Sequence, residues 1–257
     1  MTVDLGFAEV TFGQRFIELK GKKGSVVRDE GKEREVPPAT GRIPVPLDRF
    51  LEALGEVMMD SLRRESSTPG GEASSPEVEA GSPTGEAEQS ERTPNQEGIG
   101  SGERRRFRFR GQEGLSLLLA PARGRIWLSL ARVRDGKVIE RTAGVVRLSG
   151  ALVLADAAGR VLLEGKILRR LQPAVFLAEK GSVSFMDGSS ETALQLHQRL
   201  ELSHLLTASF LGAERPFTFR AGRVAVARNG DGRMELTFGR NRGELSPGDL
   251  MVIRSCL

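Results

Sequence analysis

The chain has 257 residues, of which 39% are hydrophobic and 28% charged, and its formal net charge at pH 7 is +4. This composition suits a globular protein with one or two ordinary cores, and no apolar run approaches the length of a membrane span. The single cysteine, Cys256, excludes an internal disulfide, and the N-terminal residues lack the charged-then-apolar pattern of a secretory signal. We therefore expect a cytoplasmic protein.

The first part of the chain, residues 1–64, has the pattern of several strands followed by one helix. From Asp48 to Arg64 the apolar residues recur near i, i+3 and i+4 spacing, which predicts an amphipathic helix. Strands are expected before it at Val3 to Phe12, Arg15 to Lys20, Ser25 to Arg28 and around Ile43.

Residues 65–103 form an acidic segment with nine glutamates, one arginine and almost no large apolar side chain. Such a segment cannot bury enough surface to offset the entropy of ordering it, so we expect a disordered linker. Because its net charge is −8 and the whole chain carries +4, the other residues carry +12. That balance favours a polyanionic partner, although arginines spread over solvated faces would give the same composition.

Residues 104–171 follow the same order of elements as the first part. Arg106 to Arg110 alternates strictly between arginine and phenylalanine, which is typical of a half-buried strand. A helix from Ser149 through Arg170 would close this part. The alternative is a pair of strands with a turn at Ala158-Gly159, because glycine weakens a helix. Further strands are expected at Leu115 to Ala120, Arg125 to Val133 and Val138 to Leu148, with a hairpin turn at Arg134-Asp135-Gly136-Lys137.

Four landmarks recur in one order at an offset of about 105 residues, which indicates an internal repeat. We therefore predict that residues 1–64 and 104–171 are two copies of one module and pack together as related halves. The landmarks pair Val27–Lys32 with Val133–Lys137, Gly41–Pro46 with Gly144–Ser149, Ala53–Asp60 with Ala157–Glu164, and Leu62–Arg64 with Leu168–Arg170.

The last part, residues 172–257, begins with a sequence unlike the two copies and then contains strand patterns similar to theirs. A helix capped by Ser189 or Ser190 is expected to run to Phe210. Because few residues follow the last expected strand, we predict a partial third copy without room for a closing helix of comparable length. Its open face would be covered by the preceding helix or by a second subunit, so self-association as a homodimer through this C-terminal segment is expected. The strands are predicted at Pro173 to Glu179, Ser182 to Met186, Pro216 to Arg220, Arg223 to Arg228 and Arg233 to Leu236.

These elements give an α+β fold in which antiparallel sheets alternate with long helices. Several short stretches are similar to Pur-alpha-like repeats: Lys23–Val27 and Arg123–Leu130 resemble one strand, Arg15–Lys20 another, and Arg42–Leu54 the last strand and helix. The resemblance implies that four strands and a helix form a repeat and that two repeats intertwine into a Whirly-type fold. It also implies that a third repeat can dimerise and that the sheets bind single-stranded DNA or RNA.

Cations beside aromatic side chains on the polar faces of the expected sheets are the candidate nucleic-acid contacts. Trp127 lies beside Arg125 and Ser129, on the side of the strand opposite Ile126 and Leu128. Such a ring stacks on a base, which is worth roughly 1–3 kcal/mol, while the cations hold phosphates. The alternative places Trp127 and Phe16 in the core between repeats. The candidates are Arg15, Phe16, Lys20, Lys22, Lys23, Arg106, Arg108, Arg110, Arg125, Trp127, Ser129, Arg220 and Arg223.

Signatures of catalysis or metal binding are poor, so we expect neither an enzyme nor a cofactor or metal. His197 and His204 lie seven residues apart without a third ligand near them, and Cys256 has no histidine close to it in the sequence. The sequence leaves two functions open: single-stranded nucleic-acid binding, or a structural and interaction module without it. A steep salt dependence of binding would favour the first, because phosphate contacts release counterions.

Overall fold

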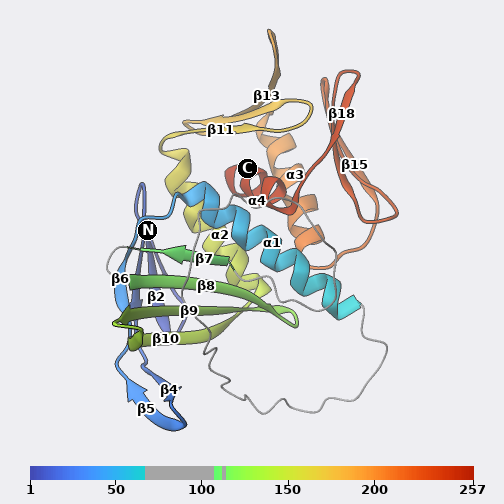
Figure 1. Cartoon of the computed structure of the whole chain (residues 1–257). Coiled ribbons are helices and arrows are strands. Elements are labelled where there is room, and N and C mark those ends of the chain that lie inside the picture. The colour runs from blue at the N-terminus through green and yellow to red at the C-terminus, as the bar shows by residue number, and fades with distance from the viewer. Residues whose placement is uncertain (67–106, 112–113) are drawn as a thin grey trace.

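A computed structural model of the chain, which describes residues 1–66, 107–111 and 114–257, repeats one arrangement four times (Figure 1). Each unit is a four-stranded antiparallel sheet followed by one helix. The described residues therefore have an α+β fold built from repeated sheet-and-helix modules, which we number I to IV in chain order.

Modules I and II form the N-terminal half of the molecule. In sheet I the strand order is β1-β2-β3-β6, and in sheet II it is β10-β9-β8-β7. Module I comprises β1 (Thr2–Asp4), β2 (Ala8–Phe12), β3 (Ile17–Gly21), β6 (Thr40–Ile43) and α1 (Leu47–Ser66), with β4 (Ser25–Asp29) and β5 (Lys32–Val36) as a separate hairpin. Module II comprises β7 (Phe107–Arg110), β8 (Leu115–Ala122), β9 (Arg125–Arg134), β10 (Lys137–Arg147) and α2 (Leu148–Leu163).

Modules III and IV form the C-terminal half, and in both the strands follow one another as simple meanders. Module III comprises β11 (Lys166–Arg170), β12 (Val175–Glu179), β13 (Ser182–Asp187), β14 (Ser190–Ala193) and α3 (Leu196–Phe210). Module IV comprises β15 (Phe217–Ala221), β16 (Val224–Arg228), β17 (Met234–Phe238), β18 (Asn241–Glu244) and α4 (Pro247–Cys256).

Two equivalent hairpin turns explain the first repeated landmark. In β4–β5, Glu30 and Gly31 both have positive φ, and in β9–β10, Asp135 and Gly136 do. Positive φ at both central residues defines a type I′ turn, whose twist matches that of the strands it joins. The long strands β9 and β10 thus correspond to β3 plus β4 and to β5 plus β6, respectively.

The helices of modules I and II each reach the sheet of the other module. Helix α1 packs against β8 and β9 of sheet II, and α2 packs against β1 and β2 of sheet I as well as against β9 and β10 of its own sheet. Two equivalent glycines permit this close fit: a side chain at Gly41 would overlap Leu115, and one at Gly144 would overlap Phe7. Thr142 also joins the modules, because its hydroxyl accepts from the Ala39 amide at 3.0 Å and donates to the Lys23 carbonyl at 2.9 Å.

All four helices lie in one layer, with sheets I and II on one side and sheets III and IV on the other (Figure 1). Helix α4 is buried on nearly every side, and it contacts each of the other three helices. Its first turn is closed by a capping box, in which the Ser246 hydroxyl and the Asp249 carboxylate accept from each other's backbone amide.

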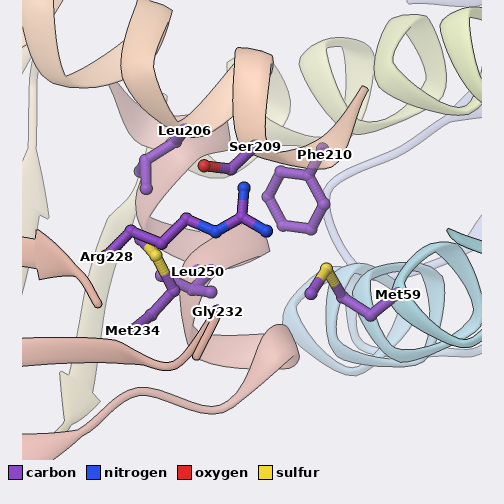
Figure 2. A pocket seen from close by; sticks show the side chains of 8 residues that line it. All are labelled: Met59, Leu206, Ser209, Phe210, Arg228, Gly232, Met234 and Leu250. Carbon is purple, nitrogen blue, oxygen red and sulfur yellow. The ribbon is translucent and has the colours of Figure 1, made fainter. Parts of the chain in front are cut away.

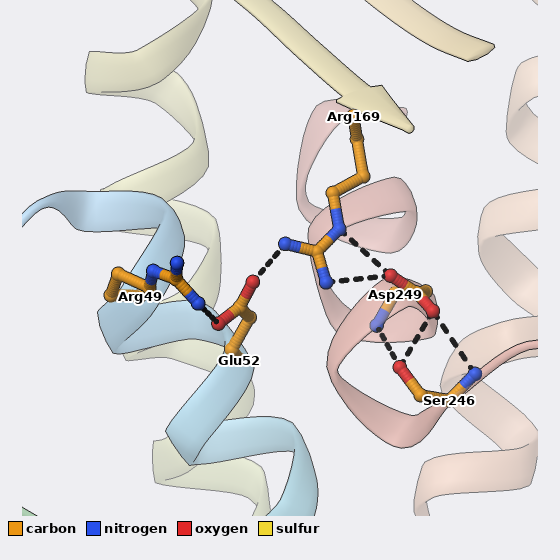
Figure 3. Close-up of polar contacts among 5 residues, drawn as sticks. All are labelled: Arg49, Glu52, Arg169, Ser246 and Asp249. Atoms are coloured by element: carbon orange, nitrogen blue, oxygen red, sulfur yellow. Dashed lines mark hydrogen bonds and ion pairs between the residues drawn. The ribbon is translucent and has the colours of Figure 1, made fainter. Parts of the chain in front are cut away.

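An ion cluster ties this helix layer to sheet III (Figure 3). The Arg169 guanidinium on β11 pairs with Glu52 of α1 and with Asp249 of α4, its Nε lying 2.8 Å from Asp249 Oδ1. Arg49 also pairs with Glu52, at 2.9 Å. Because three elements share one half-buried guanidinium, the cluster fixes how β11, α1 and α4 sit against one another.

The structure confirms the strands predicted in residues 104–148 and corrects the helix that follows. Helix α2 begins at Leu148 and ends at Leu163, so the helix predicted through Arg170 is too long. The alternative with a turn at Ala158-Gly159 is wrong because both residues are helical. Residues 166–170 form β11, which opens module III rather than closing module II.

The C-terminal prediction needs a larger correction. Residues 190–193 form β14, so the helix predicted from Ser189 or Ser190 begins only at Leu196. A closing helix does follow the last strands, since α4 occupies residues 247–256, although it is shorter than α1 and α2. Ten residues suffice because α4 is buried among the other helices. Residues 166–257 therefore form two complete sheet-and-helix modules, and the expectation of an unfinished third copy is wrong.

Two smaller differences concern module I. The strand predicted at Val3 to Phe12 is divided into β1 and β2 by a turn at Gly6, and β5 was not predicted because its residues are mostly charged. Helix α1 extends to Ser66, and the rest of the acidic segment predicted at 65–103 lies outside the described residues.

Candidate nucleic-acid interface

The outer face of sheet II, turned away from the helices, gathers the largest set of predicted contact residues. Strand pairing places the outward side chains in four rows. We call this surface the Trp127 face. Its rows are Ala122-Arg125-Arg147, Ala120-Trp127-Val145, Arg108-Leu118-Ser129-Ala143 and Arg110-Ser116-Ala131-Arg141.

Trp127 stands in the apolar middle of this face and is half-buried. It does not belong to the hydrophobic core formed by the described residues, whereas its neighbours Ile126 and Leu128 do. Val145, directly opposite on β10, is 43% exposed. The indole therefore lies on the solvent side of the sheet, which rejects the alternative that Trp127 packs between repeats. Ser129 lies on the same face but is only 5% exposed, so little of it can reach a ligand.

Five arginines surround this apolar middle: Arg108, Arg110, Arg125, Arg141 and Arg147. None of them forms an ion pair with another described residue, and the four rows contain no aspartate or glutamate. Burial lowers the pKa of Arg141, although a guanidinium stays protonated at pH 7. A desolvated cation without a counter-ion is stabilised by an incoming anion, so the face is arranged to receive a polyanion.

The equivalent face of sheet I carries the opposite chemistry. When the modules are aligned on Gly41 and Gly144, Glu18 takes the place of Trp127, and Asp4 that of Arg108. Glu9 lies between them on β2 and takes the place of Leu118. The face of sheet I is therefore acidic at the positions where sheet II is cationic or apolar.

Two cations beside these acids, Lys22 and Arg42, are already neutralised by them. Lys22 Nζ lies 2.7 Å from the Asp4 carboxylate and 3.4 Å from that of Glu9, and Arg42 lies 3.0 Å from Glu18. The hydrogen bond from Lys22 lowers the pKa of Asp4, and the same bond raises the pKa of Lys22. A phosphate would have to compete with these carboxylates for the Lys22 ammonium group. Lys22 is therefore poorly placed for the phosphate contact predicted from the sequence.

The other sequence candidates of module I are dispersed. Phe16 is half-buried at the end of sheet I, and the Arg42 guanidinium lies over its ring at 4.8 Å from the centroid. That ring face is therefore occupied. Arg15, Lys20 and Lys23 are exposed, but they lie on module I rather than beside Trp127.

The remaining candidates lie elsewhere. Arg220 is on the outer face of sheet IV, in a row with Ala225, Thr237 and Arg242 that contains no aromatic residue. Arg223 donates to the Ser190 hydroxyl at 2.6 Å and lies over the Phe238 ring, which ties module IV to module III. Arg106 lies outside the described residues.

Two arginines of the Trp127 face, Arg141 and Arg147, were missed by the sequence analysis. Both lie on β10 with the same parity as Val145, and pairing with β9 sets Arg147 opposite Arg125. The alternation along residues 141–147 was the available signal. It was hidden because the strand was identified without its register to β9.

The described part of the chain offers little else that could serve as a site. A small hollow between α1, α3 and sheet IV is lined mostly by apolar side chains, and Arg228 extends into it (Figure 2). The guanidinium already donates a hydrogen bond to the Ala213 carbonyl. Within residues 1–66, 107–111 and 114–257, no three histidine, cysteine or acidic side chains gather as metal ligands. In the same residues, no helix combines the length and apolarity needed to cross a bilayer.

A comparison with protein-family models, with curated proteins and with solved structures finds no match to this chain.

Proposed function

We propose that this protein binds single-stranded DNA or RNA through the Trp127 face of sheet II, without catalysing a reaction. One observation carries the proposal: an aromatic ring outside the core lies among five arginines that have no carboxylate partner in the described structure. Single-strand binders combine a cationic surface for the backbone with a ring on which a base stacks.

The geometry favours a single strand over a duplex. The indole can stack on a base only where that base is not already stacked on its neighbours, as in a single strand. The arginines around the indole can meanwhile contact the phosphates of the same strand. If all five arginines contact phosphates, the logarithm of the binding constant should fall with the logarithm of salt concentration at a slope of about 3.5, since each single-strand contact contributes about 0.7.

We also propose that modules I and II form a Pur-alpha-like pair with a Whirly-type arrangement. The packing of α1 on sheet II and of α2 on both sheets supports this proposal, because the resemblance implies that two repeats intertwine. The proposed binding surface is smaller than the one expected from the sequence, which included the polar faces of several sheets. Here only sheet II serves, since sheet I is acidic at the equivalent positions, Arg242 of sheet IV is paired with Glu235, and the row that holds Arg220 has no aromatic residue.

The test is a titration of labelled single- and double-stranded oligonucleotides by fluorescence anisotropy at two salt concentrations. We expect tighter binding of the single strand and a steep loss of affinity in added salt. The double variant Arg125→Ala/Arg147→Ala should lose most of this affinity. The matched control is Arg220→Ala/Arg242→Ala on sheet IV, which removes the same charge and should bind nearly as the unaltered protein does. Equal losses in both variants, or no binding at all, would overturn the proposal.

A further inference from the structure

The outer face of sheet III, like that of sheet II, is apolar in the middle, but its described residues include no aromatic ring. Leu168 is 64% exposed there, and Val175, Leu177 and Met186 are half-exposed around it. The opposite face of the same sheet packs Phe176 and Phe185 into the core. A sheet with both faces apolar is expected to be covered on both sides. In the described structure, only the helix side is covered (Figure 1).

The strand pairing of sheet III fixes the layout of this face. We call it the Leu168 face. One row reads Arg170-Val175-Met186-Glu191 from β11 to β14, the next reads Leu168-Leu177-Ser184-Ala193, and the last reads Lys166-Glu179-Ser182. The first row carries opposite charges at its two ends. The second row runs from large side chains on β11 and β12 to small ones on β13 and β14.

This layout is complementary to itself about a two-fold axis. An axis parallel to the strands, between β12 and β13, lays β11 of one copy over β14 of the other. Arg170 then faces Glu191, and Leu168 faces Ala193. Leu177 faces the buried Ser184 in the same way, so that in the second row each large side chain meets a small one. In the first row, by contrast, Val175 faces Met186. Sheets packed face to face in this aligned manner lie about 10 Å apart, which is the distance such side chains fill.

The charges also select this axis over the other one. A two-fold axis perpendicular to the strands would lay β11 over β11 and bring Arg170 of one copy against Lys166 of the other, where like charges repel. Neither Arg170 nor Glu191 forms an ion pair in the described monomer, whereas Lys166 is already paired with Glu179 at 3.4 Å. Arg170 and Glu191 are therefore both available to a second copy.

We propose that two copies of this chain associate through the Leu168 face as a symmetric dimer, with sheet III of one stacked on sheet III of the other. The sequence analysis expected self-association because the last module was predicted to lack a full closing helix. That reason no longer holds, since α4 completes module IV. The Leu168 and Trp127 faces lie on opposite sides of the helix layer, so the dimer presents both Trp127 faces outward (Figure 1). The proposal does not depend on nucleic-acid binding. Because one small sheet is less than a standard interface, we expect a micromolar dimer.

Sedimentation velocity of the full chain over a range of concentrations tests the dimer. The unaltered protein should pass from monomer to dimer as its concentration rises through the micromolar range. Leu168→Glu should weaken the dimer by about 10- to 100-fold, because a symmetric interface contains each change twice. Its melting temperature, measured at a concentration where the unaltered protein is monomeric, should stay unchanged since the side chain is exposed. The matched control is Leu200→Glu on α3, which alters another exposed leucine and should leave the dimer intact.

A charge exchange tests the axis. Arg170→Glu and Glu191→Arg should each weaken the dimer, since each sets like charges against one another across the interface. The double variant Arg170→Glu/Glu191→Arg should restore it. A protein that stays monomeric at millimolar concentration would overturn the proposal, and so would dissociation by Leu200→Glu but not by Leu168→Glu. Failure of the double variant to restore association would also overturn it.

Discussion

The backbone of Gly159 in α2 lies directly against the Ser255 carbonyl of α4, at a point where any side chain would overlap that oxygen. Gly55 of α1 approaches α4 in the same way. A Cβ atom there would lie 2.5 Å from the Pro247 carbonyl oxygen and 2.8 Å from Met251 Cβ. One glycine from each of the first two modules, Gly55 and Gly159, thus allows its helix to pack closely against α4 of the fourth module.

Gly159→Ala should therefore destabilise the protein by about 1–3 kcal/mol, because overpacking forces α2 and α4 apart. This loss is expected although alanine favours a helix by about 1 kcal/mol over glycine. Urea denaturation measures it. Gly165→Ala is the control, since its nearest neighbour would be the Leu162 carbonyl at an ordinary 3.5 Å. An equally or more stable Gly159→Ala protein would show that the two helices do not meet there.

Trp127→Ala should weaken single-strand binding by roughly 1–3 kcal/mol and leave the fold intact, because the ring stacks on a base and lies outside the core. Melting temperature and oligonucleotide affinity are measured on the same preparation. Loss of a core indole would instead cost about 3–5 kcal/mol of stability. Unchanged affinity in a stable variant would remove the stacking contact.

Arg125→Ala should reduce the salt slope of binding by about 0.7, because it removes one phosphate contact from a single strand. Arg42→Ala on sheet I removes the same charge, but Arg42 already pairs with Glu18 at 3.0 Å. The slope of that variant should stay close to the original value. Affinities measured at four or five salt concentrations give both slopes. Equal changes in the two variants would contradict a site confined to sheet II.

The Cys256 thiol should be unreactive in the folded protein. Burial raises its pKa from the ordinary 9.0 to about 12, so the nucleophilic thiolate is scarce at pH 8. Iodoacetamide should label it slowly in native protein and quickly in urea. Since the unfolded thiol releases its proton first, this group should lower the stability as pH rises from about 9 towards 12. Rapid native labelling would show that the C-terminal turn of α4 opens easily.

Much of the module pattern follows from short-range features of the sequence. The strict alternation at residues 107–110 predicts β7 correctly, since a pleated strand places successive side chains on opposite faces. The apolar spacing of residues 48–64 likewise predicts α1. Helix α4 was missed because nearly every face of it is buried, so its apolar residues lack the one-sided spacing that identifies a surface helix.

The sequence by itself determined the repeat of strands and helix, the basic balance of the residues outside 65–103 and the polar side of β9 on which Trp127 lies. Only the tertiary structure decided which cations share a surface with that ring. Arg147 lies beside Arg125 because of the register of β10 with β9, and Lys22 is neutralised by Asp4 because β2 pairs with both β1 and β3. Register and ion pairing depend on residues distant in the chain, and alternation within a single strand carries no information about either.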